Sequence, residues 1–220
     1  MERKLEFSIG EFYHAYNRGG NKSVIFLDDK DRERFQKLLF ICNGTKPVIF
    51  KTIQGLPLDK VNRGETLVDI GAYCLMPNHF HLLLKEKIEK GISLFMSKLL
   101  TSYSMYFNKK YERTGPVFES RFKATHLNED KYLKYIFSYI HLNPIKIIDP
   151  LWKENGITDL QKSKIYLLDY KYSSYGDYMG LEREWKCILN ISEFPEYFLN
   201  FREFENYIDE WLKYPRADLG

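Results

Sequence analysis

Apolar and polar positions along this chain follow two different periods. The helical spacing, with apolar residues at every third or fourth position, occurs in segments 28–42, 91–111 and 128–143. Shorter apolar or aromatic runs, which favour strands or extended chain, occupy 12–17, 67–75, 79–85 and 118–127. The runs 67–75 and 79–85 flank the turn Met76-Pro77-Asn78, so we expect them to pair as a hairpin. Strands and helices therefore alternate along the chain.

The third predicted helix has recognisable ends. Asn128 is a candidate N-cap, and Glu129 and Asp130 would lie in the first turn, where carboxylates interact favourably with the helix dipole. Pro144 should end the helix, because the residue before a proline is kept out of helical geometry. We therefore predict a helix that carries Tyr139 and Asn143 near its end.

Two segments stand apart from this order. Segment 46–65 includes a possible strand, 48–53, and then a loop with Gly, Pro and Asn, so we interpret it as an insertion. After about residue 180 the chain becomes acidic, and we predict a mostly helical tail there. The expected organisation is one domain over 1–180 and an acidic helical tail over 181–220.

Composition excludes several classes of protein. With 220 residues and 44% hydrophobic content the chain can bury a core. No apolar run approaches 18 residues, which argues against a membrane span, and MERKLEFSIG lacks an apolar signal core. The three cysteines are far apart, which fits a reducing cytoplasm and argues against a disulfide scaffold or a cysteine-rich zinc site. We therefore expect a cytoplasmic protein without membrane association.

Charge is unevenly distributed along the chain. The net charge is only +3, yet residues 91–126 hold six basic and two acidic residues, and residues 181–220 hold five basic and nine acidic ones. This asymmetry suggests a body that binds a polyanion, followed by an acidic tail. The alternative is that both are ordinary solvated surfaces.

The most unusual stretch is CLMPNHFHLLLK, where an apolar run is interrupted by His79-Phe80-His81. In a strand, residues two apart point to the same face, so His79 and His81 should project side by side while Phe80 enters the core. Two adjacent imidazoles are half of a divalent metal site. The alternative is that they are hydrogen-bonded core or surface histidines without a metal.

The predicted helix 128–143 offers further ligands. Tyr139 and Asn143 are four residues apart and share one face, so an amide oxygen and a phenol would lie one turn apart. Two histidines, one amide oxygen and open positions suit Mg²⁺ or Mn²⁺. Tyr139 could equally be a core residue, Tyr132 and Tyr135 lie on nearly the same face, and His141 is another possible ligand.

A series of motifs resembles the single-tyrosine HUH transposases, and most closely the REP-associated tyrosine transposases. In chain order the motifs are YHAYNRG, AYCLMPNHFHLLLK, SKLLTSYSMYFNKKYERTGPVFESRFKA, YIHLNP and YSSYGDYMG. Together they cover roughly residues 12–180. The resemblance implies an α+β fold of the ferredoxin-like HUH nuclease type, with helices packed on an antiparallel sheet. This agrees with the order of elements predicted above.

The resemblance also implies a site and a reaction. His79 and His81 match the metal ligands of the family, Asn143 the polar third ligand and Tyr139 the catalytic nucleophile. The implied reaction is nicking and joining of single-stranded DNA, with hairpins, through a 5′-phosphotyrosine and with Mg²⁺ or Mn²⁺. A monomer is favoured by the resemblance and a homodimer remains possible.

DNA binding is expected from the basic middle of the chain and from Arg18. The candidate residues, which stand near aromatic side chains that unpaired bases can stack on, are Arg18, Lys109, Lys110, Arg113, Arg121 and Lys123. Two other functions stay open. One is a catalytically inactive protein that binds nucleic-acid hairpins, and the other is a metal-dependent hydrolase of small substrates. A zinc deaminase is disfavoured because no PCxxC accompanies the histidines.

Overall fold

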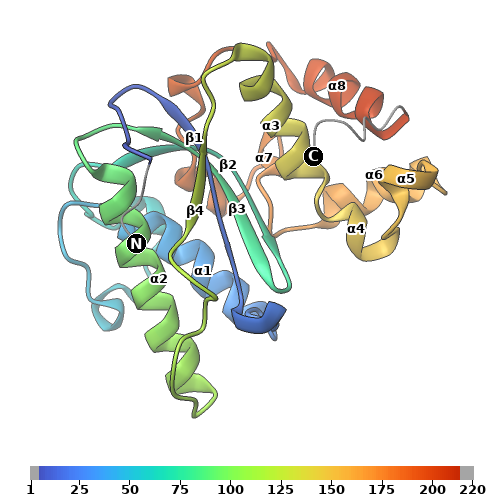
Figure 1. The fold of residues 1–220 in the computed structure, drawn as a ribbon. Helices are drawn as coiled ribbons and strands as arrows, with labels where there is room; N and C mark the ends of the chain where they lie inside the picture. The colour runs from blue at the N-terminus through green and yellow to red at the C-terminus, as the bar shows by residue number, and fades with distance from the viewer. Residues whose placement is uncertain (1–4, 214–220) are drawn as a thin grey trace.

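The computed structural model describes residues 5–213 (Figure 1). Its strands are β1 (Phe12–Arg18), β2 (Val68–Met76), β3 (His79–Glu86) and β4 (Lys123–His126). Its longer helices are α1 (Asp29–Cys42), α2 (Gly91–Lys110), α3 (Asp130–Leu142), α6 (Leu160–Asp169) and α8 (Phe201–Lys213). Short helices are α4 (Ile145–Ile148), α5 (Trp152–Asn155) and α7 (Tyr175–Tyr178). Single 3-10 turns are η1 (Gly20–Lys22), η2 (Phe50–Ile53), η3 (Leu58–Lys60), η4 (Glu184–Ile188) and η5 (Ile191–Glu193).

The four strands form one antiparallel sheet in the order β2-β3-β1-β4. The elements β1, α1, β2, β3, α2 and β4 follow the β-α-β-β-α-β order of a ferredoxin-like fold, and α3 comes next. The predicted α+β class and the hairpin of β2 and β3 are confirmed. The central pair, β1 and β3, places Tyr16 opposite His81 and Arg18 opposite His79.

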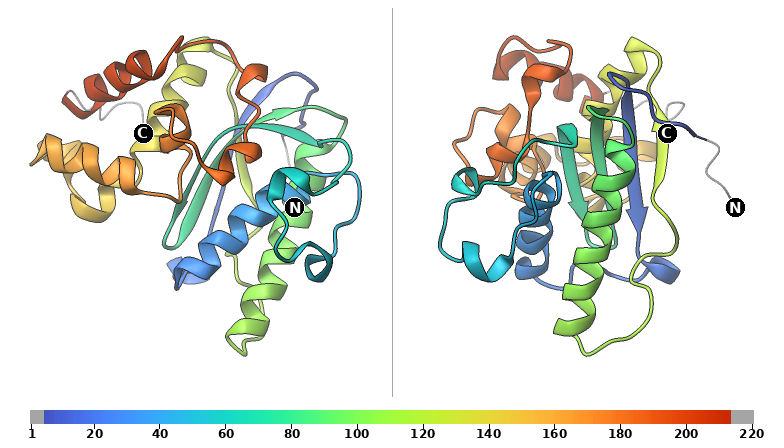
Figure 2. Two further views of the ribbon diagram at one scale, coloured as in Figure 1. Left: turned by 180° about the vertical axis from the view of Figure 1, so that it is seen from behind. Right: turned by 90° about the vertical axis from the view of Figure 1, so that its left-hand side faces the viewer.

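Helices cover both faces of this sheet (Figures 1 and 2). One face packs against α1 and α2 in a large apolar cluster that includes Phe35, Phe80 and Leu99. The opposite face packs against α3 through a smaller cluster that includes Cys74, Leu83 and Ile136. Because side chains alternate along a strand, β1 and β3 send every second residue to each cluster. The position of Phe80 in the first cluster puts its neighbours His79 and His81 on the α3 face.

Carboxylates accept hydrogen bonds from free N–H groups at the start of α1 and of α2. Asp28 caps α1 by accepting a hydrogen bond from the Asp31 N–H at 2.9 Å, and Asp31 bonds back, which forms a capping box. The buried carboxylate of Glu86, at the end of β3, accepts from the Ile92 N–H at 2.7 Å in the first turn of α2. The first contact caps α1, and the second joins the start of α2 to the end of β3.

Three local predictions require correction. Helix α3 begins at Asp130 after an N-cap at Glu129, so Asn128 does not cap it. The helix does end before Pro144, but Asn143 keeps helical angles (φ −53°, ψ −39°) and α4 follows at once. The predicted strand 48–53 is instead a 3-10 turn, η2, with Ile49 67% exposed.

The reason for the missing strand lies at the edge of the sheet. The outer edge of β2 is already paired, because Leu75 N–H donates to Tyr172 O and Ser174 N–H to Tyr73 O, both at 2.9 Å. The two ends of segment 46–65 bond to each other, with Lys46 N–H donating to Arg63 O at 2.9 Å. Without a free strand edge beside it, its backbone forms turns.

Residues after 180 pack closely on the rest of the chain. Trp185 and Ile188 join the cluster under α1, and Phe204, Ile208 and Leu212 of α8 pack on the elements that follow α3. The predicted helical C-terminal portion is confirmed by α8 and the short turns η4 and η5, and residues 214–220 of the predicted tail lie outside the described residues. The division into a domain and a tail stays a prediction. Within residues 5–213, every helix is too short or too polar to span a membrane.

Candidate functional site

His79 and His81 lie side by side at the start of β3, with 5.0 Å between their ring centroids. His81 is buried, with 5% of its surface exposed, and His79 is half-buried. Burial is the main cause that lowers the pKa of both imidazoles, to about 4 for His79. The charges of Lys146 and Arg18 lower the pKa of His79 further. For His81 the smaller causes are His14, His79 and Lys146. Both rings are therefore neutral at neutral pH, the state in which imidazole binds a metal ion.

A hydrogen bond holds one nitrogen of each imidazole. His79 Nδ1 lies 2.7 Å from Asn78 Oδ1, and because that oxygen can only accept, Nδ1 carries the proton. His81 Nδ1 lies 2.9 Å from His14 Nε2 on the neighbouring strand β1. When His81 Nδ1 donates to His14, the Nε2 atoms of His79 and His81 both keep free lone pairs. Such outer partners orient metal-binding histidines in known sites.

Tyr139 of α3 packs against these rings. Its ring centroid lies 5.3 Å from that of His81 and 5.6 Å from that of His14, both edge-on. Leu133, Ile136 and Ile140 bury the same helix against the sheet, so the position of Tyr139 is set by core packing. Tyr132 is 40% exposed, and Tyr135 packs on Trp211 of α8. Of the three tyrosines on this side of α3, Tyr139 is the one with a ring contact to a histidine in the described residues.

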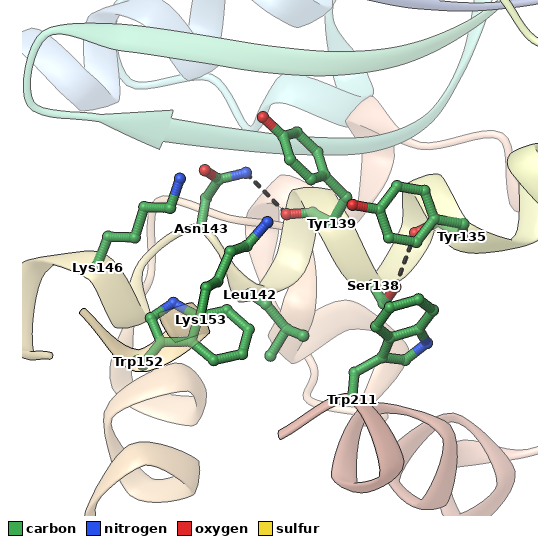
Figure 3. A pocket seen from close by; sticks show the side chains of 9 residues that line it. All are labelled: Tyr135, Ser138, Tyr139, Leu142, Asn143, Lys146, Trp152, Lys153 and Trp211. Carbon is green, nitrogen blue, oxygen red and sulfur yellow. Dashed lines mark hydrogen bonds between the residues drawn. The ribbon is translucent and has the colours of Figure 1, made fainter. Parts of the chain in front are cut away.

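Asn143 lies one turn further along, buried to 3% exposure. Its Nδ2–H donates to Tyr139 O at 2.7 Å, which fixes the amide and leaves Oδ1 as an acceptor. Figure 3 shows the amide and the Tyr139 hydroxyl both directed towards the β2–β3 hairpin. His141, the alternative ligand, points elsewhere: its Nε2 lies 2.7 Å from Ser174 Oγ, among Tyr178 and Phe204.

The donors present fit the predicted cation in kind. Within residues 5–213 no three side chains of the His, Cys, Asp and Glu types meet as a metal site. A divalent ion would therefore depend on His79, His81, the amide oxygen of Asn143 and oxygen atoms from water or substrate. That set is open and neutral, which suits an ion that must also bind an anionic phosphate. The ligand roles and the choice of Mg²⁺ or Mn²⁺ stay predictions.

The electrostatics of Tyr139 set a chemical requirement. Burial raises the pKa of its phenol above the usual value near 10, and Tyr16 and Cys74 add to the shift. A neutral phenol is a weak nucleophile. Any reaction at its oxygen therefore needs positive charge nearby, from a bound cation or from basic side chains.

The predicted DNA-binding residues fall into two groups. Arg18 and Lys123 pair with Glu119, the latter at 3.3 Å, and Lys110 lies 2.7 Å from Asp31 Oδ1 in a buried network at the start of α1. Lys109, Arg113 and Arg121 are exposed and have no ion-pair partner among residues 5–213. The first group therefore already has ion-pair partners. The second group, Lys109, Arg113 and Arg121, is available to bind phosphates.

Residues 60–143 match the model of a family described as "Transposase IS200 like". Over this segment the chain is similar to the IS200-like transposases. The match spans β2 to α3 and contains both histidines of β3, Tyr139 and Asn143. The predicted resemblance is thereby confirmed. Comparison with curated proteins gives no match.

The fold resembles that of the REP-associated tyrosine transposase bound to a REP hairpin. The TM-score is 0.50 at 13% identity, over 84% of this chain and 89% of that chain. This likeness supports the predicted fold class. A second solved structure, the tRNA(His) guanylyltransferase from Saccharomyces cerevisiae, has a TM-score of 0.36 at 15% identity, over 90% of this chain and 86% of that chain. That similarity is too low to carry an argument.

The site also contains residues that sequence reasoning missed. His14 and Tyr16 of β1 line the pocket beside Tyr139 and His81. Both occur in the motif YHAYNRG, and their spacing of two residues signals a shared face. Lys146 and Lys153, which follow Asn143, line a second pocket on the other side of Tyr139.

Proposed function

We propose that this protein cuts and rejoins single-stranded DNA through a covalent bond to Tyr139. The observation that carries the proposal is the packing of the Tyr139 ring on His81, with 5.3 Å between centroids, at the junction of α3 and the sheet. Kinship with the IS200-like transposases favours a DNA-processing enzyme. Likeness of fold to a transposase bound to a hairpin favours a substrate strand that contains hairpins.

The proposed reaction is a phosphoryl transfer. The Tyr139 oxygen attacks the phosphorus of a phosphodiester and loses its proton to water, while the bond from phosphorus to the 3′-oxygen breaks. The 3′-oxygen takes up a proton and leaves as a hydroxyl, and the 5′ side remains as a phosphotyrosine. A 3′-hydroxyl from another strand end reverses these steps. One phosphodiester replaces another, so joining needs no ATP.

The chain contributes positioning as well as the nucleophile. Asn78 and His14 hold the imidazoles so that His79 and His81 can present Nε2 to Mg²⁺ or Mn²⁺, and Asn143 presents its amide oxygen. When bound, the ion supplies Lewis-acid polarisation of the phosphate. Packing of α3 on the sheet keeps the phenol in one place, which removes orientational freedom before the reaction. Lys109, Arg113 and Arg121 would hold flanking phosphates.

The test is capture of the covalent intermediate. Wild-type protein is mixed with labelled single-stranded DNA containing a hairpin, plus Mg²⁺ or Mn²⁺, and then denatured in detergent before electrophoresis. The label should migrate with the protein, and EDTA or Tyr139→Phe should abolish that band. Tyr132→Phe, on the same helix and exposed, is the matched control and should keep it.

The outcomes separate the enzyme from the open alternatives. DNA binding without any adduct across such strands would favour an inactive hairpin-binding protein. An adduct that persists in Tyr139→Phe would assign the nucleophile to another residue. Hydrolysis of small substrates that survives Tyr139→Phe but not His79→Ala would favour a metal-dependent hydrolase.

A further inference from the structure

A small pocket on the outer side of Tyr139 gathers positive charge. It lies between α3, α4, α5 and α8, and its lining residues, shown in Figure 3, are Tyr135, Ser138, Tyr139, Leu142, Asn143, Lys146, Trp152, Lys153 and Trp211. Two of the nine are lysines and none is acidic. The lysines come from α4 and α5, beyond the segment that matches the transposase family.

Lys153 lies directly against the nucleophile. Its Nζ is 5.1 Å from the centroid of the Tyr139 ring and 6.0 Å from that of Trp152. The side chain is half-buried and has no ion-pair partner among residues 5–213. Burial lowers the pKa of Lys153, the charge of Lys146 lowers it further, and Glu154 partly offsets both. A half-buried ammonium group beside a second one is unfavourable until an anion compensates it.

Lys146 lies in the same pocket as Asn143, which is three residues before it in the chain. Its side chain is exposed, likewise without an ion-pair partner in the described part of the chain. Figure 3 shows the amino groups of Lys146 and Lys153 on the same side as the Asn143 amide, directed towards the β2–β3 hairpin.

An unsatisfied donor gives an independent indication of a ligand. Trp152 is buried, with 2% of its surface exposed, and its Nε1–H has no acceptor in the described residues. Figure 3 shows this nitrogen on the edge of the indole that faces the lysine side chains. Buried donors are nearly always paired, so the orphan indicates an acceptor from outside the chain or a water molecule. The pocket interior has about 20 Å³ of free space, room for one water.

We propose that Lys146 and Lys153 form a phosphate-binding site for the DNA strand at Tyr139. The phosphate lies at the mouth of the pocket between the two ammonium groups, and Trp152 reaches it through one water. The site adds the positive charge that a half-buried phenol requires, on the Asn143 side of Tyr139. It deepens the proposed function and rests on it for the identity of the ligand as single-stranded DNA.

The experiment measures equilibrium binding in EDTA, where no metal-dependent reaction occurs. A labelled DNA strand with one hairpin and single-stranded flanks is titrated with full-length protein at several salt concentrations, and fluorescence anisotropy is recorded. Each lost phosphate contact should reduce the slope of log K against log salt by about 0.7. Lys146→Met/Lys153→Met removes one such contact, so it should lose about 0.7 from the slope and bind about tenfold more weakly at low salt.

Matched variants separate charge from packing. Lys153→Arg keeps the charge and should bind as wild type, which a purely structural role for Lys153 does not predict. Lys146→Gln alters an exposed side chain, so it should fold normally. Its slope should fall by about half as much as that of the double variant. Lys162→Met removes an exposed lysine of α6 outside the pocket and should leave both affinity and slope unchanged.

Failure of this inference is distinct from failure of the proposed function. The inference is overturned when the double variant and Lys146→Gln match Lys162→Met in affinity and slope, whatever the wild type does with Mg²⁺. Absence of a covalent adduct in wild type overturns the proposed reaction, while a reduced slope in the lysine variants still supports the phosphate site.

Discussion

Both faces of the central sheet bury apolar side chains, but the α3 face also buries two histidines. Against α1 and α2 the sheet presents residues such as Ala15, Phe80 and Leu82, packed in one large apolar cluster. Against α3 it presents His14 and His81, which are buried although their nitrogens need hydrogen-bond partners. Burying polar groups stabilises a fold little and can weaken it. We infer that the first face holds the fold together and that the second keeps its histidines for chemistry.

The largest expected effect tests this division at two consecutive residues. Phe80→Ala should lower the free energy of unfolding by about 3–5 kcal/mol, because it leaves a cavity beside Phe35 and Phe118. His81→Ala, on the opposite face, should cost no more than about 2 kcal/mol, since water can reach the vacated partner through the neighbouring pocket. Urea unfolding in EDTA measures both. Equal losses would contradict the division.

A smaller effect is expected at His14, on the neighbouring strand. His14→Ala removes the partner of His81 Nδ1, and loss of such an outer hydrogen bond typically weakens metal binding about 10–100-fold. Titration with Mn²⁺ followed by electron paramagnetic resonance measures this without DNA. His126→Ala, on β4 and paired with Glu11 at 2.9 Å, is the control and should bind Mn²⁺ as wild type. Unchanged affinity in His14→Ala would remove His14 from the site.

The smallest effect concerns the imidazole on the far side of α3. Burial lowers the pKa of His141 to about 3, against about 6.5 when unfolded. The unfolded chain therefore binds the extra proton first, so this residue makes stability fall as pH drops from about 6.5 towards 3. His141→Gln should remove up to about 1.4 kcal/mol per pH unit from that dependence. Urea unfolding at several pH values checks it, and an unchanged slope would contradict the cause.

Much of the fold follows from periodicity in the sequence. Alternation within 79–85 is enough to place Phe80 opposite His79 and His81, and the spacing of four residues places Tyr139 and Asn143 on one face. These inferences need only the geometry of a single element. The segment 48–53 shows the limit, since its strand-like composition gives no strand when Tyr172–Ser174 already occupies the edge of β2.

The missed residues depend on contacts between elements. His14 meets His81 only because β1 pairs with β3 in the register that sets Tyr16 opposite His81, and neither strand alone specifies that register. Lys153 reaches Tyr139 because the chain turns back through α4 and α5 after Pro144. The N-cap of α3 was predicted one residue too early, at Asn128, because Glu129 takes that position.

Helix α3 is held from outside as well as by the sheet. The Trp211 ring of α8 packs at a tilt on Tyr135, with 4.9 Å between centroids, and Tyr207 O–H donates to Lys134 O at 3.1 Å. A DNA end joined to Tyr139 would therefore be attached to a helix that is held on two sides and moves little. A second DNA end would then have to approach by bending or sliding of the DNA. The distance over which two ends can be joined would therefore depend on the length and flexibility of the DNA between them.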